Sequence, residues 1–295
     1  MVIKYNTKRD SYNFSKNSAN FFINIGLQVT RRCNLKCIYC CEPKQIADSN
    51  FNTIKKIVDK LAENGLKKIC VTGGEPLLRK DLLDILKYIK SKQIYITLST
   101  NGSLLDKNKL EKIEPHINNI RFSIRGLEKN HNEITKSPYN FNETIKNIQS
   151  AVELKIPVSV VATIILKNHK EMLDMAVLCE KNKVEKLYFF SLISRGRGTK
   201  IFKEESVNFK KSLKEYEKIL EISKKEKWNM ETNIIDWSIE GQCVLVFPNG
   251  EIAGVPSFSD KDNTKIIGNV LTDDIAELWR EYQFKENYIN YYVNH

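Results

Sequence analysis

Short apolar runs alternate with amphipathic segments through residues 21–192, and this alternation constrains the fold more than any other feature. The runs are rich in Val, Ile and Phe, as buried β-strands are, and the segments between them carry apolar residues at helical spacing. We expect strands at 21–30, 67–72, 94–100, 117–124, 157–166 and 184–192. We expect helices at 51–64, 81–90, 103–113, 142–154 and 169–182. Repeated β-then-α units predict a parallel sheet covered by helices.

Six such units are too few for a closed eight-fold barrel. The sequence therefore predicts an α/β fold, a partial (β/α)6 TIM-like barrel that stays open, with a small α+β C-terminal extension. The pattern breaks at Arg195-Gly196-Arg197-Gly198; beyond it we expect one helix at 203–226, short strands at 244–247 and 251–255, and a helix at 273–284. The expected division is a polar N-terminal segment at 1–20, the barrel at 21–198 and the extension at 199–295.

Composition narrows the function classes. Of 295 residues, 41% are hydrophobic and 28% charged, which fits a packed globular protein. No apolar run approaches the ~18 residues of a membrane span, and the N-terminus lacks a signal-peptide core, so we expect no membrane partner and a cytoplasmic location. The net charge of +11 indicates a lysine-rich surface or an anionic partner. Nucleic acid is an unlikely partner because no basic run is interleaved with aromatics.

Three cysteines follow the first expected strand in the run Cys33-Asn34-Leu35-Lys36-Cys37-Ile38-Tyr39-Cys40. Cysteine is the usual ligand of iron–sulfur clusters, and three thiolates leave one iron of a [4Fe–4S] cubane open. A zinc knuckle is the alternative, but the adjacent Cys41 pairs awkwardly with Cys40 and no second Cys/His pair occurs. Cys70 and Cys179 are expected to be inert buried thiols in a strand and a helix.

Small and polar residues mark the C-terminal ends of the expected strands, where parallel barrels gather their catalytic groups. The second strand ends in Gly73-Gly74-Glu75-Pro76. The later strands end in or carry Ser99 and Asn101, Ser123 and Arg125, Thr163, and Ser191. This segregation of polar ends from apolar strand interiors predicts a site at one end of the barrel.

With the C-x3-C-x2-C loop after the first strand and Gly-Gly-Glu-Pro after the second, the chain resembles the radical S-adenosylmethionine (SAM) superfamily over residues 21–195. The resemblance implies that Cys33, Cys37 and Cys40 hold a [4Fe–4S] cluster whose fourth iron binds the amino and carboxylate groups of SAM. Reductive cleavage of SAM then yields a 5′-deoxyadenosyl radical that abstracts a substrate hydrogen. An external one-electron donor of the flavodoxin or ferredoxin type is implied.

The resemblance also implies roles for the strand-end residues in binding SAM. Gly73, Gly74, Glu75 and Pro76 would hold the methionyl part, and Tyr39 would lie against the adenine. Ser99 and Asn101 would bind the methionyl carboxylate or the ribose. Ser123 would contact the ribose, and Thr163 would also bind the cofactor. Arg125 would pair with the SAM carboxylate, although many relatives carry Asp-Gly where this chain has Arg125-Gly126.

Residues 240–282 resemble the SPASM or twitch extension of peptide-modifying relatives, through Pro248-Asn249-Gly250, Gly268-Asn269 and Trp279. That extension normally supplies several cysteines for auxiliary clusters, whereas here only Cys243 is present. We therefore expect a single cluster and favour a redox-neutral outcome. Cys243 is a candidate hydrogen-atom donor to the substrate radical; the alternative is that it is a structural leftover.

The expected substrate is a ribosomally made peptide, which would undergo epimerisation, cross-linking or another modification. A separate leader-binding protein is a possible partner, because a fused leader-binding domain does not fit before the first strand. The alternative is the same chemistry on a small metabolite, sugar or nucleotide, and an open groove at the barrel mouth would favour the peptide. The remote alternative is a non-enzymatic metal-binding module.

Overall fold

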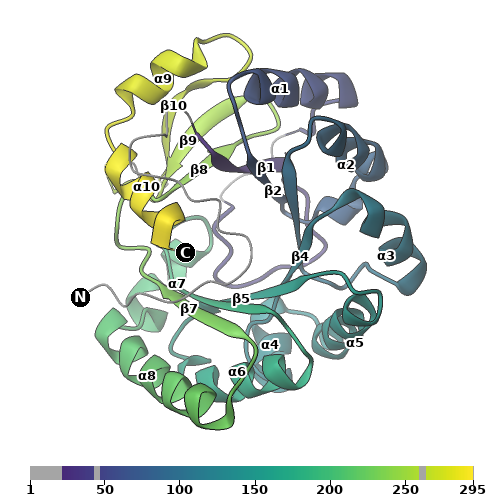
Figure 1. The fold of residues 1–295 in the computed structure, drawn as a ribbon. Helices are drawn as coiled ribbons and strands as arrows, with labels where there is room; N and C mark the ends of the chain where they lie inside the picture. The colour runs from purple at the N-terminus through teal and green to yellow at the C-terminus, as the bar shows by residue number, and fades with distance from the viewer. Residues whose placement is uncertain (1–21, 43–46, 259–263, 295) are drawn as a thin grey trace.

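The computed structural model describes residues 22–42, 47–258 and 264–294, and its centre is one strongly curved sheet (Figure 1). The sheet order is β10-β9-β8-β1-β2-β3-β4-β5-β6-β7. The strands are β1 Asn24–Thr30, β2 Lys68–Gly73, β3 Tyr95–Thr100, β4 Asn119–Ser123, β5 Val158–Ile164, β6 Lys186–Ser191, β7 Glu231–Ile235, β8 Cys243–Val246, β9 Glu251–Val255 and β10 Lys265–Asn269. The expected segment at 1–20 lies outside the described residues.

Helices surround the sheet, most of them on its convex side (Figure 1). They are α1 Phe51–Glu63, α2 Leu82–Ser91, α3 Lys107–Ile113, α4 Glu128–Thr135, α5 Asn140–Glu153, α6 Met172–Lys181, α7 Gly198–Glu205, α8 Phe209–Glu226, α9 Ile275–Glu281 and α10 Lys285–Asn294. In the described part of the chain, none of them has both the length and the hydrophobicity that crossing a bilayer requires.

The predicted open α/β barrel is confirmed, and four further strands widen its sheet. β7 pairs in parallel with β6, and β8 pairs in parallel with β1 through Gly26 and Leu245. β9 and β10 continue the sheet antiparallel beyond β8. The segment expected to be a separate C-terminal extension therefore contributes strands to the barrel sheet itself. The division of the chain at residue 198 stays a prediction.

Local differences from the expected elements have identifiable causes. The single helix expected at 203–226 is wrong: α7 ends at Glu205, and α8 starts afresh after Asn208, whose side chain accepts a hydrogen bond from the backbone N–H of Lys210. Asn is a strong helix N-cap, and a new helix starts after Asn208. The elements α4, α10, β7 and β10 were not expected, because they are short and their apolar patterns are weak.

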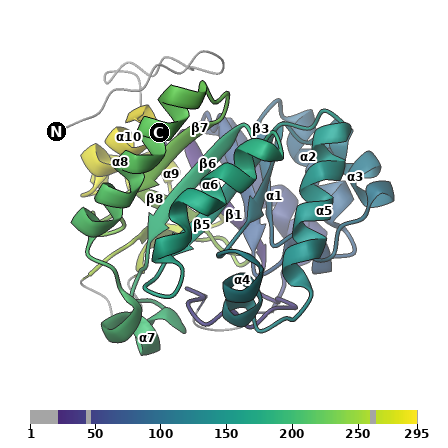
Figure 2. The same ribbon diagram turned by 90° about the horizontal axis from the view of Figure 1, so that it is seen from below.

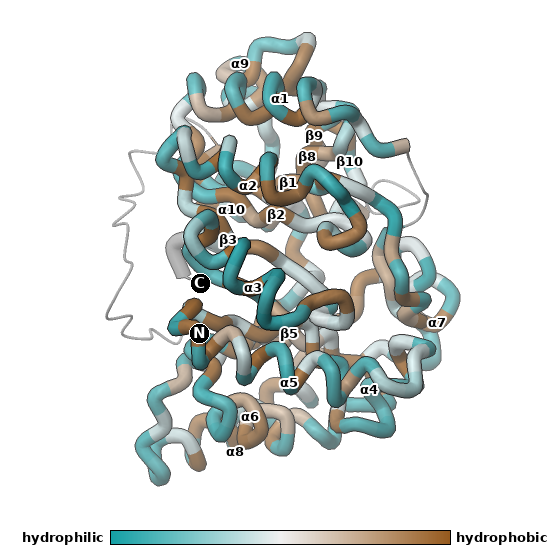
Figure 3. The backbone as a smooth tube through the Cα atoms, turned by 90° about the vertical axis from the view of Figure 1, so that its right-hand side faces the viewer, coloured by the Kyte–Doolittle hydropathy of each residue, from teal (hydrophilic) through white to brown (hydrophobic). Residues whose placement is uncertain are grey.

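The two faces of the sheet carry different kinds of side chain. Side chains that point outward under the helices are aliphatic or aromatic and fully buried, as Val71, Leu98 and Phe122 are. Because strand side chains alternate, their neighbours Cys70, Ser99 and Arg121 face the barrel lumen, and these are only partly buried. In Figure 3 the strands are mostly apolar, and the helices around them carry more polar residues. The lumen is thus lined by polar groups rather than filled by the aliphatic layers of a closed barrel.

The barrel has two distinct ends. We call the end formed by the C-terminal ends of the parallel strands the mouth, and the opposite end the floor. Figure 2 shows α4 and α7 at the mouth and α10 at the floor. The floor position of α10 is fixed by Tyr288, whose hydroxyl donates to the carbonyl of Asn24 (2.6 Å) and accepts from its N–H (2.9 Å) at the start of β1.

Candidate functional site

The loop at residues 31–42, which we call the cysteine loop, leaves β1 at the mouth and carries the three motif cysteines. Cys37 is buried, whereas Cys33 and Cys40 are partly buried. The backbone N–H of Leu35 donates to Cys33 Sγ (3.4 Å). The loop has no regular secondary structure, so its shape depends on contacts with the loops around it.

The Gly-Gly-Glu-Pro segment after β2 forms the first of these contacts. The N–H of Gly74 donates to the carbonyl of Thr30, and the N–H of Glu75 donates to that of Arg32, both at 2.8 Å. A Cβ on Gly74 would lie 2.2 Å from the Arg32 carbonyl oxygen, a distance no side chain tolerates. The glycines therefore let two backbones touch. Pro76 then begins a short 3-10 turn. The role of this segment in holding the methionyl group stays a prediction.

Glu75 is fully buried, and its carboxylate joins the loops after β2 and β3. It accepts hydrogen bonds from Thr100 Oγ1 (2.8 Å), the Leu77 N–H (3.2 Å) and the Asn101 N–H (2.7 Å). Burial raises the pKa of this carboxyl, and the hydrogen bonds oppose that effect. The structure thus gives Glu75 a positioning role in addition to the predicted contact with SAM.

Asn101 fixes the cysteine loop beside Cys33. Its Nδ2 donates to Asn34 Oδ1 (2.9 Å), and its Oδ1 accepts from the N–H and hydroxyl of Ser103 (2.9 and 2.6 Å). Asn34 Nδ2 completes the network by donating to Ser103 Oγ (2.8 Å). Ser99, one strand step inside the barrel, is partly buried. The sequence indicated Asn101 but not its partners Asn34 and Ser103.

Two further segments hold the cysteine loop. The N–H of Ile38 donates to the carbonyl of Ile134 at the C-terminal end of α4 (3.0 Å). After β6, Arg197 donates from its backbone N–H to the Cys40 carbonyl and from Nε to the Cys37 carbonyl, both at 2.8 Å. The sequence places Arg197 after the sixth strand, among the polar residues of the mouth, but it does not predict these contacts with the cysteine loop.

Arg125 extends from the end of β4 toward the thiols. Its Nη1 donates to the Ser123 carbonyl (3.1 Å), and its guanidinium carbon lies 6.0 Å from the centre of the Tyr39 ring. Burial by itself lowers the pKa of Arg125, but the neighbouring groups, Cys37 first, raise it overall. Its Nε is buried without a hydrogen-bond partner among the described residues. Such a cation suits an anionic group bound beside the cysteines.

His131 on α4 holds the backbone of Arg125. Its Nδ1 accepts from the Arg125 N–H (3.2 Å), which leaves the proton of the neutral ring on Nε2. Burial, and next Arg125, lower the pKa of His131 to about 3. Asn140 Nδ2 lies 2.6 Å from Nε2 while Asn140 Oδ1 lacks a partner, so reversing that amide satisfies both groups. A single His in a weakly patterned helix gave no sequence signal.

Tyr39 and Thr163 come together at the mouth. The Tyr39 side chain is partly buried and packs against an apolar cluster of Ile134, Ile165 and Leu192. Its hydroxyl interacts with the side chain of Thr163, and burial raises its pKa. The predicted contact of Tyr39 with adenine stays a prediction, as does that of Ser123 with the ribose.

Cys243 is not brought together with the other predicted site residues. It starts β8, level with Asn24 at the floor, which is roughly 20 Å along β1 from the cysteine loop. The Tyr292 hydroxyl donates to its Sγ (3.7 Å). Burial raises the pKa of this thiol to about 11, so it keeps its proton near neutral pH.

The mouth residues fit a [4Fe–4S] cluster better than a single metal ion. No three His, Cys, Asp or Glu side chains in the described ranges converge on one ion. The three motif thiols are free, and they are close enough that Cys37 and Cys40 add to burial in raising the pKa of Cys33 to about 11. A cubane binds each thiolate through a different iron, so it needs wider spacing than zinc does. The unpartnered Nε of Arg125 supplies a cation for such a group.

The open barrel and the cysteine loop at its mouth define an iron–sulfur enzyme class. The profile of the Radical SAM superfamily matches residues 27–179, and the chain belongs to that superfamily. Its cofactors are a [4Fe–4S] cluster and SAM. When bound, they supply a one-electron cleavage of the SAM sulfonium that produces a hydrogen-abstracting radical.

The chain is similar to enzymes with different substrates. It is 30% identical to Fe-coproporphyrin III synthase of Methanosarcina barkeri over 67% of this chain and 50% of that protein. It is 31% identical to GTP 3′,8-cyclase of Clostridium perfringens over 79% and 72%. It is 28% identical to the sporulation killing factor maturation protein SkfB of Bacillus subtilis over 74% and 53%. The chain spans about half the length of the curated relatives that it matches first.

Solved structures share the fold. SuiB of Streptococcus suis bound to SAM superposes with a TM-score of 0.76 at 16% identity, over 90% of this chain and 67% of SuiB. The same protein bound to its precursor peptide SuiA gives 0.75 at 17% identity over 90% and 66%. At this identity the likeness concerns the fold alone.

Proposed function

We propose that this radical SAM enzyme modifies a ribosomally made peptide, which enters the lumen through a groove at the barrel mouth. The groove has a volume of about 270 Å³ and lies between the end of β6, the α7–α8 junction and the segment after β7. Phe202 and Phe258 line it and remain 36% and 52% exposed. Exposed aromatic side chains around a groove are typical of a binding surface.

A row of aromatic rings leads from the groove into the lumen, and this row is the observation that carries the proposal. Trp237 lines the groove and lies 5.4 Å from the ring of lumen-facing Phe190. Phe190 in turn stacks on Tyr188 at 6.4 Å, deeper in the barrel. A peptide lying in the groove can therefore pass one side chain along an aromatic wall toward the radical chemistry. A sealed pocket would have favoured a small metabolite.

Two relatives support a peptide, and one supports a nucleotide. SkfB is named as a maturation protein, and SuiB has been solved with a precursor peptide. The similarity to GTP 3′,8-cyclase, which covers 79% of this chain, makes a nucleotide the second candidate. The C-terminal strands β8–β10 and α9 are proposed to be a SPASM-like extension without auxiliary-cluster cysteines, as in peptide-modifying relatives.

The residues of this chain then perform separate tasks. Cys33, Cys37 and Cys40 would hold the cluster, and Arg125 would pair with the SAM carboxylate. Glu75 and Asn101 hold the cysteine loop in place, which preorganises the site before SAM arrives. Tyr39, Ser99, Ser123 and Thr163 would complete the SAM site. The electron comes from an external flavodoxin- or ferredoxin-type donor, and a separate leader-binding protein would help to recruit the peptide.

Cys243 is retained as a proposed hydrogen donor because the floor faces the substrate from the side opposite the mouth. Its S–H bond would break as a C–H bond forms on the substrate radical, which leaves a thiyl radical. One electron and one proton from the external donor and solvent would restore the thiol. If a hydrogen atom leaves one face of the reacting carbon and another returns to the opposite face, the configuration of that carbon is inverted. Epimerisation is therefore the favoured outcome.

Anaerobic turnover tests the proposal. The reconstituted enzyme would receive SAM, dithionite and short peptides encoded beside its gene, each deuterated at candidate positions. We expect deuterium to appear in 5′-deoxyadenosine with a peptide and not with GTP. Deuterium transfer from labelled GTP alone would overturn the peptide assignment.

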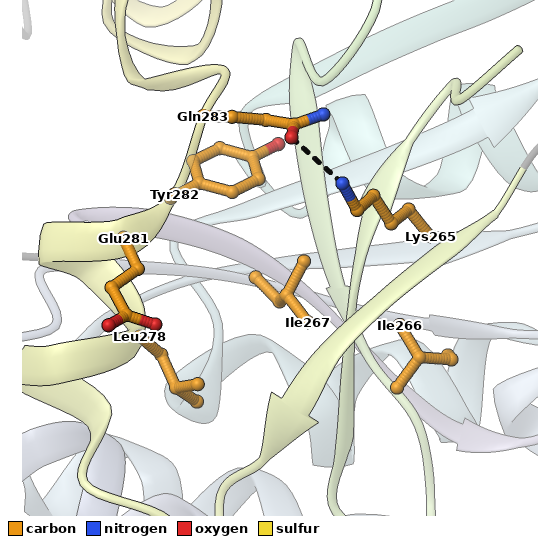
Figure 4. A pocket seen from close by; sticks show the side chains of 7 residues that line it. All are labelled: Lys265, Ile266, Ile267, Leu278, Glu281, Tyr282 and Gln283. Carbon is orange, nitrogen blue, oxygen red and sulfur yellow. Dashed lines mark hydrogen bonds between the residues drawn. The ribbon is translucent and has the colours of Figure 1, made fainter. Parts of the chain in front are cut away.

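Two variants test the groove. Phe202→Ser should weaken peptide turnover through a higher KM while leaving SAM cleavage without peptide unchanged. Ile266→Ser is the matched control, because Ile266 is 48% exposed on β10 but lines a different pocket, between β10 and α9, with Leu278 and Tyr282 (Figure 4). Equal effects of the two variants on KM would contradict a role for the groove.

A further inference from the structure

A partly buried cation at the floor of the lumen has no part in the chemistry described so far. Arg121 lies on β4 two residues before Ser123, so its side chain faces the lumen. Its Nη1 contacts Cys70 Sγ on β2 (3.9 Å), and its guanidinium carbon lies 5.4 Å from the centre of the Tyr188 ring on β6. Contacts with strands on both sides of β4 place the guanidinium well inside the barrel.

No carboxylate balances this charge within the described residues. The groups facing Arg121 are Cys70, Tyr188, Tyr291 and Tyr292, and none of them is an acid that ionises readily. Arg121 Nε is buried without a hydrogen-bond partner in the same part of the chain. By contrast, the neighbouring lumen-side Lys186 pairs with Glu231 at 3.3 Å.

An unbalanced guanidinium is costly to keep in a folded protein. A guanidinium held away from water without an anionic partner disfavours the folded state. A thiol and an aromatic face compensate only weakly. A group that disfavours folding yet faces the substrate space is best explained by an anion that arrives with the substrate.

The charge of the site selects the anion. A single guanidinium matches a carboxylate, which it can bind through two parallel hydrogen bonds. A nucleoside triphosphate brings several charges that one arginine does not neutralise. The aromatic wall of Trp237, Phe190 and Tyr188 leads from the mouth groove to this position.

We infer that Arg121 is a substrate-anchoring residue that binds a carboxylate of the substrate at the floor of the lumen. This inference rests on the proposed function and specifies its substrate: a peptide that inserts either an acidic side chain or its C-terminus. The anchor and Arg125 lie on one strand and its following loop, about 13 Å apart along the backbone. The reacting carbon would lie between them.

A thermal-shift experiment on the reconstituted enzyme tests the anchor without knowledge of the natural peptide. The probes are N-acetylphenylalanine, with a terminal carboxylate, and N-acetylglutamic acid α-methylamide, with a side-chain carboxylate. Their uncharged amides are the matched ligands, and GTP and inorganic phosphate form the phosphate arm. Ligands that bind only the folded state raise Tm. We expect one carboxylate probe to raise Tm while its amide does not, and the responding probe identifies the source of the carboxylate.

Variants assign the effect to Arg121. Arg121→Met should lower the affinity for the carboxylate probe on the order of a hundredfold, because the probe loses its charge partner. Arg121→Lys should retain part of the binding, and it keeps the test valid if the Met variant does not fold. Arg280→Met, which removes an exposed guanidinium on α9, should change nothing. Equal shifts by acid and amide, full binding by Arg121→Met, or a response to GTP alone would overturn the inference.

SAM cleavage separates this inference from the proposed function. Arg121→Met should form 5′-deoxyadenosine without substrate at a rate within about twofold of the parent, because Arg121 lies at the floor and the SAM residues lie at the mouth. An enzyme that binds the carboxylate probe but turns over GTP rather than peptides would refute the peptide assignment and leave the anchor intact. An enzyme that turns over peptides but shows no Arg121-dependent Tm shift with the probes would refute the anchor and leave the peptide assignment intact.

Discussion

The mouth and the floor of the barrel are built in opposite ways. At the mouth, the cysteine loop is held by backbone hydrogen bonds to the loops after β2 and β6 and to the end of α4. Buried Glu75 and Asn101 add three short side-chain to main-chain bonds of 2.7 to 3.2 Å. At the floor, the polar contacts of Arg121 and Cys243 run through sulfur at 3.9 and 3.7 Å.

The difference indicates what each end does. A rigid mouth keeps the cluster ligands and SAM site fixed, and most of its contacts use main-chain atoms that any side chain would leave in place. The floor uses individual side chains, which are easily exchanged, so it is the part suited to setting substrate choice. The contacts of the cysteine loop therefore serve the chemistry, whereas the mouth groove and the side chains at the floor would select the substrate.

The largest expected effect is at the mouth. Cys37→Ser removes one thiolate of the proposed cluster, and we expect reconstituted iron and 5′-deoxyadenosine formation to fall to background. Cys41→Ser is the matched control, since Cys41 is adjacent to the motif but is not expected to bind iron. Iron content and the visible absorbance of the cluster measure both. Normal cluster loading in the Cys37 variant, or its loss in the Cys41 variant, would refute the ligand assignment.

The next effect concerns the rigidity of the mouth. In the parent, three hydrogen-bond donors point at the Glu75 carboxylate. Glu75→Gln replaces one carboxylate oxygen by an NH2 group, which cannot accept from them. We therefore expect the free energy of unfolding to fall by about 3 kcal/mol. Denaturant unfolding under anaerobic conditions measures it. Exposed Glu63→Gln should change stability little. An unchanged Glu75 variant would mean that the mouth is less tightly held than its hydrogen bonds indicate.

Much of the mouth could be predicted from the sequence, and little of the floor. Strand ends with Cys33, Glu75 or Arg125 stand out because polar residues there interrupt strong apolar patterns. Arg121 gives no such signal, since one charge in a five-residue strand is compatible with either face until the register is known. The strand β8 was expected only as part of a hairpin, because parallel pairing with β1 depends on tertiary contacts.

A smaller effect should appear as the pH falls. His131 has a pKa of about 3 in the folded protein, against about 6.5 when unfolded. Below pH 6.5, His131 binds a proton in the unfolded chain but stays neutral in the folded protein. The contribution of neutral His131 to the free energy of unfolding is therefore complete above pH 6.5 and decreases as the pH falls toward 3. His131→Asn keeps an acceptor for the Arg125 N–H but does not titrate.

The difference between parent and variant isolates this group from all other titrations. We expect the parent to lose about 1.4 kcal/mol more than His131→Asn for each pH unit below 6.5. Unfolding in denaturant at pH 7.5, 6.5 and 5.5 measures the two slopes. Parallel slopes would show that His131 is protonated in the folded protein, contrary to its hydrogen bond with the Arg125 N–H.

The smallest effect on SAM cleavage is expected at the floor, from Cys243→Ala. The thiol is roughly 20 Å along β1 from the cysteine loop, so 5′-deoxyadenosine formation should stay within about twofold of the parent. Turnover in D2O provides the decisive readout, because a thiol exchanges its hydrogen with solvent. If Cys243 donates hydrogen, the parent's product carries one deuterium at the reacting carbon, and the variant loses that product while still cleaving SAM. Deuterium in the variant's product would assign the donor elsewhere, and Cys243 would then be only a packing partner of Tyr292.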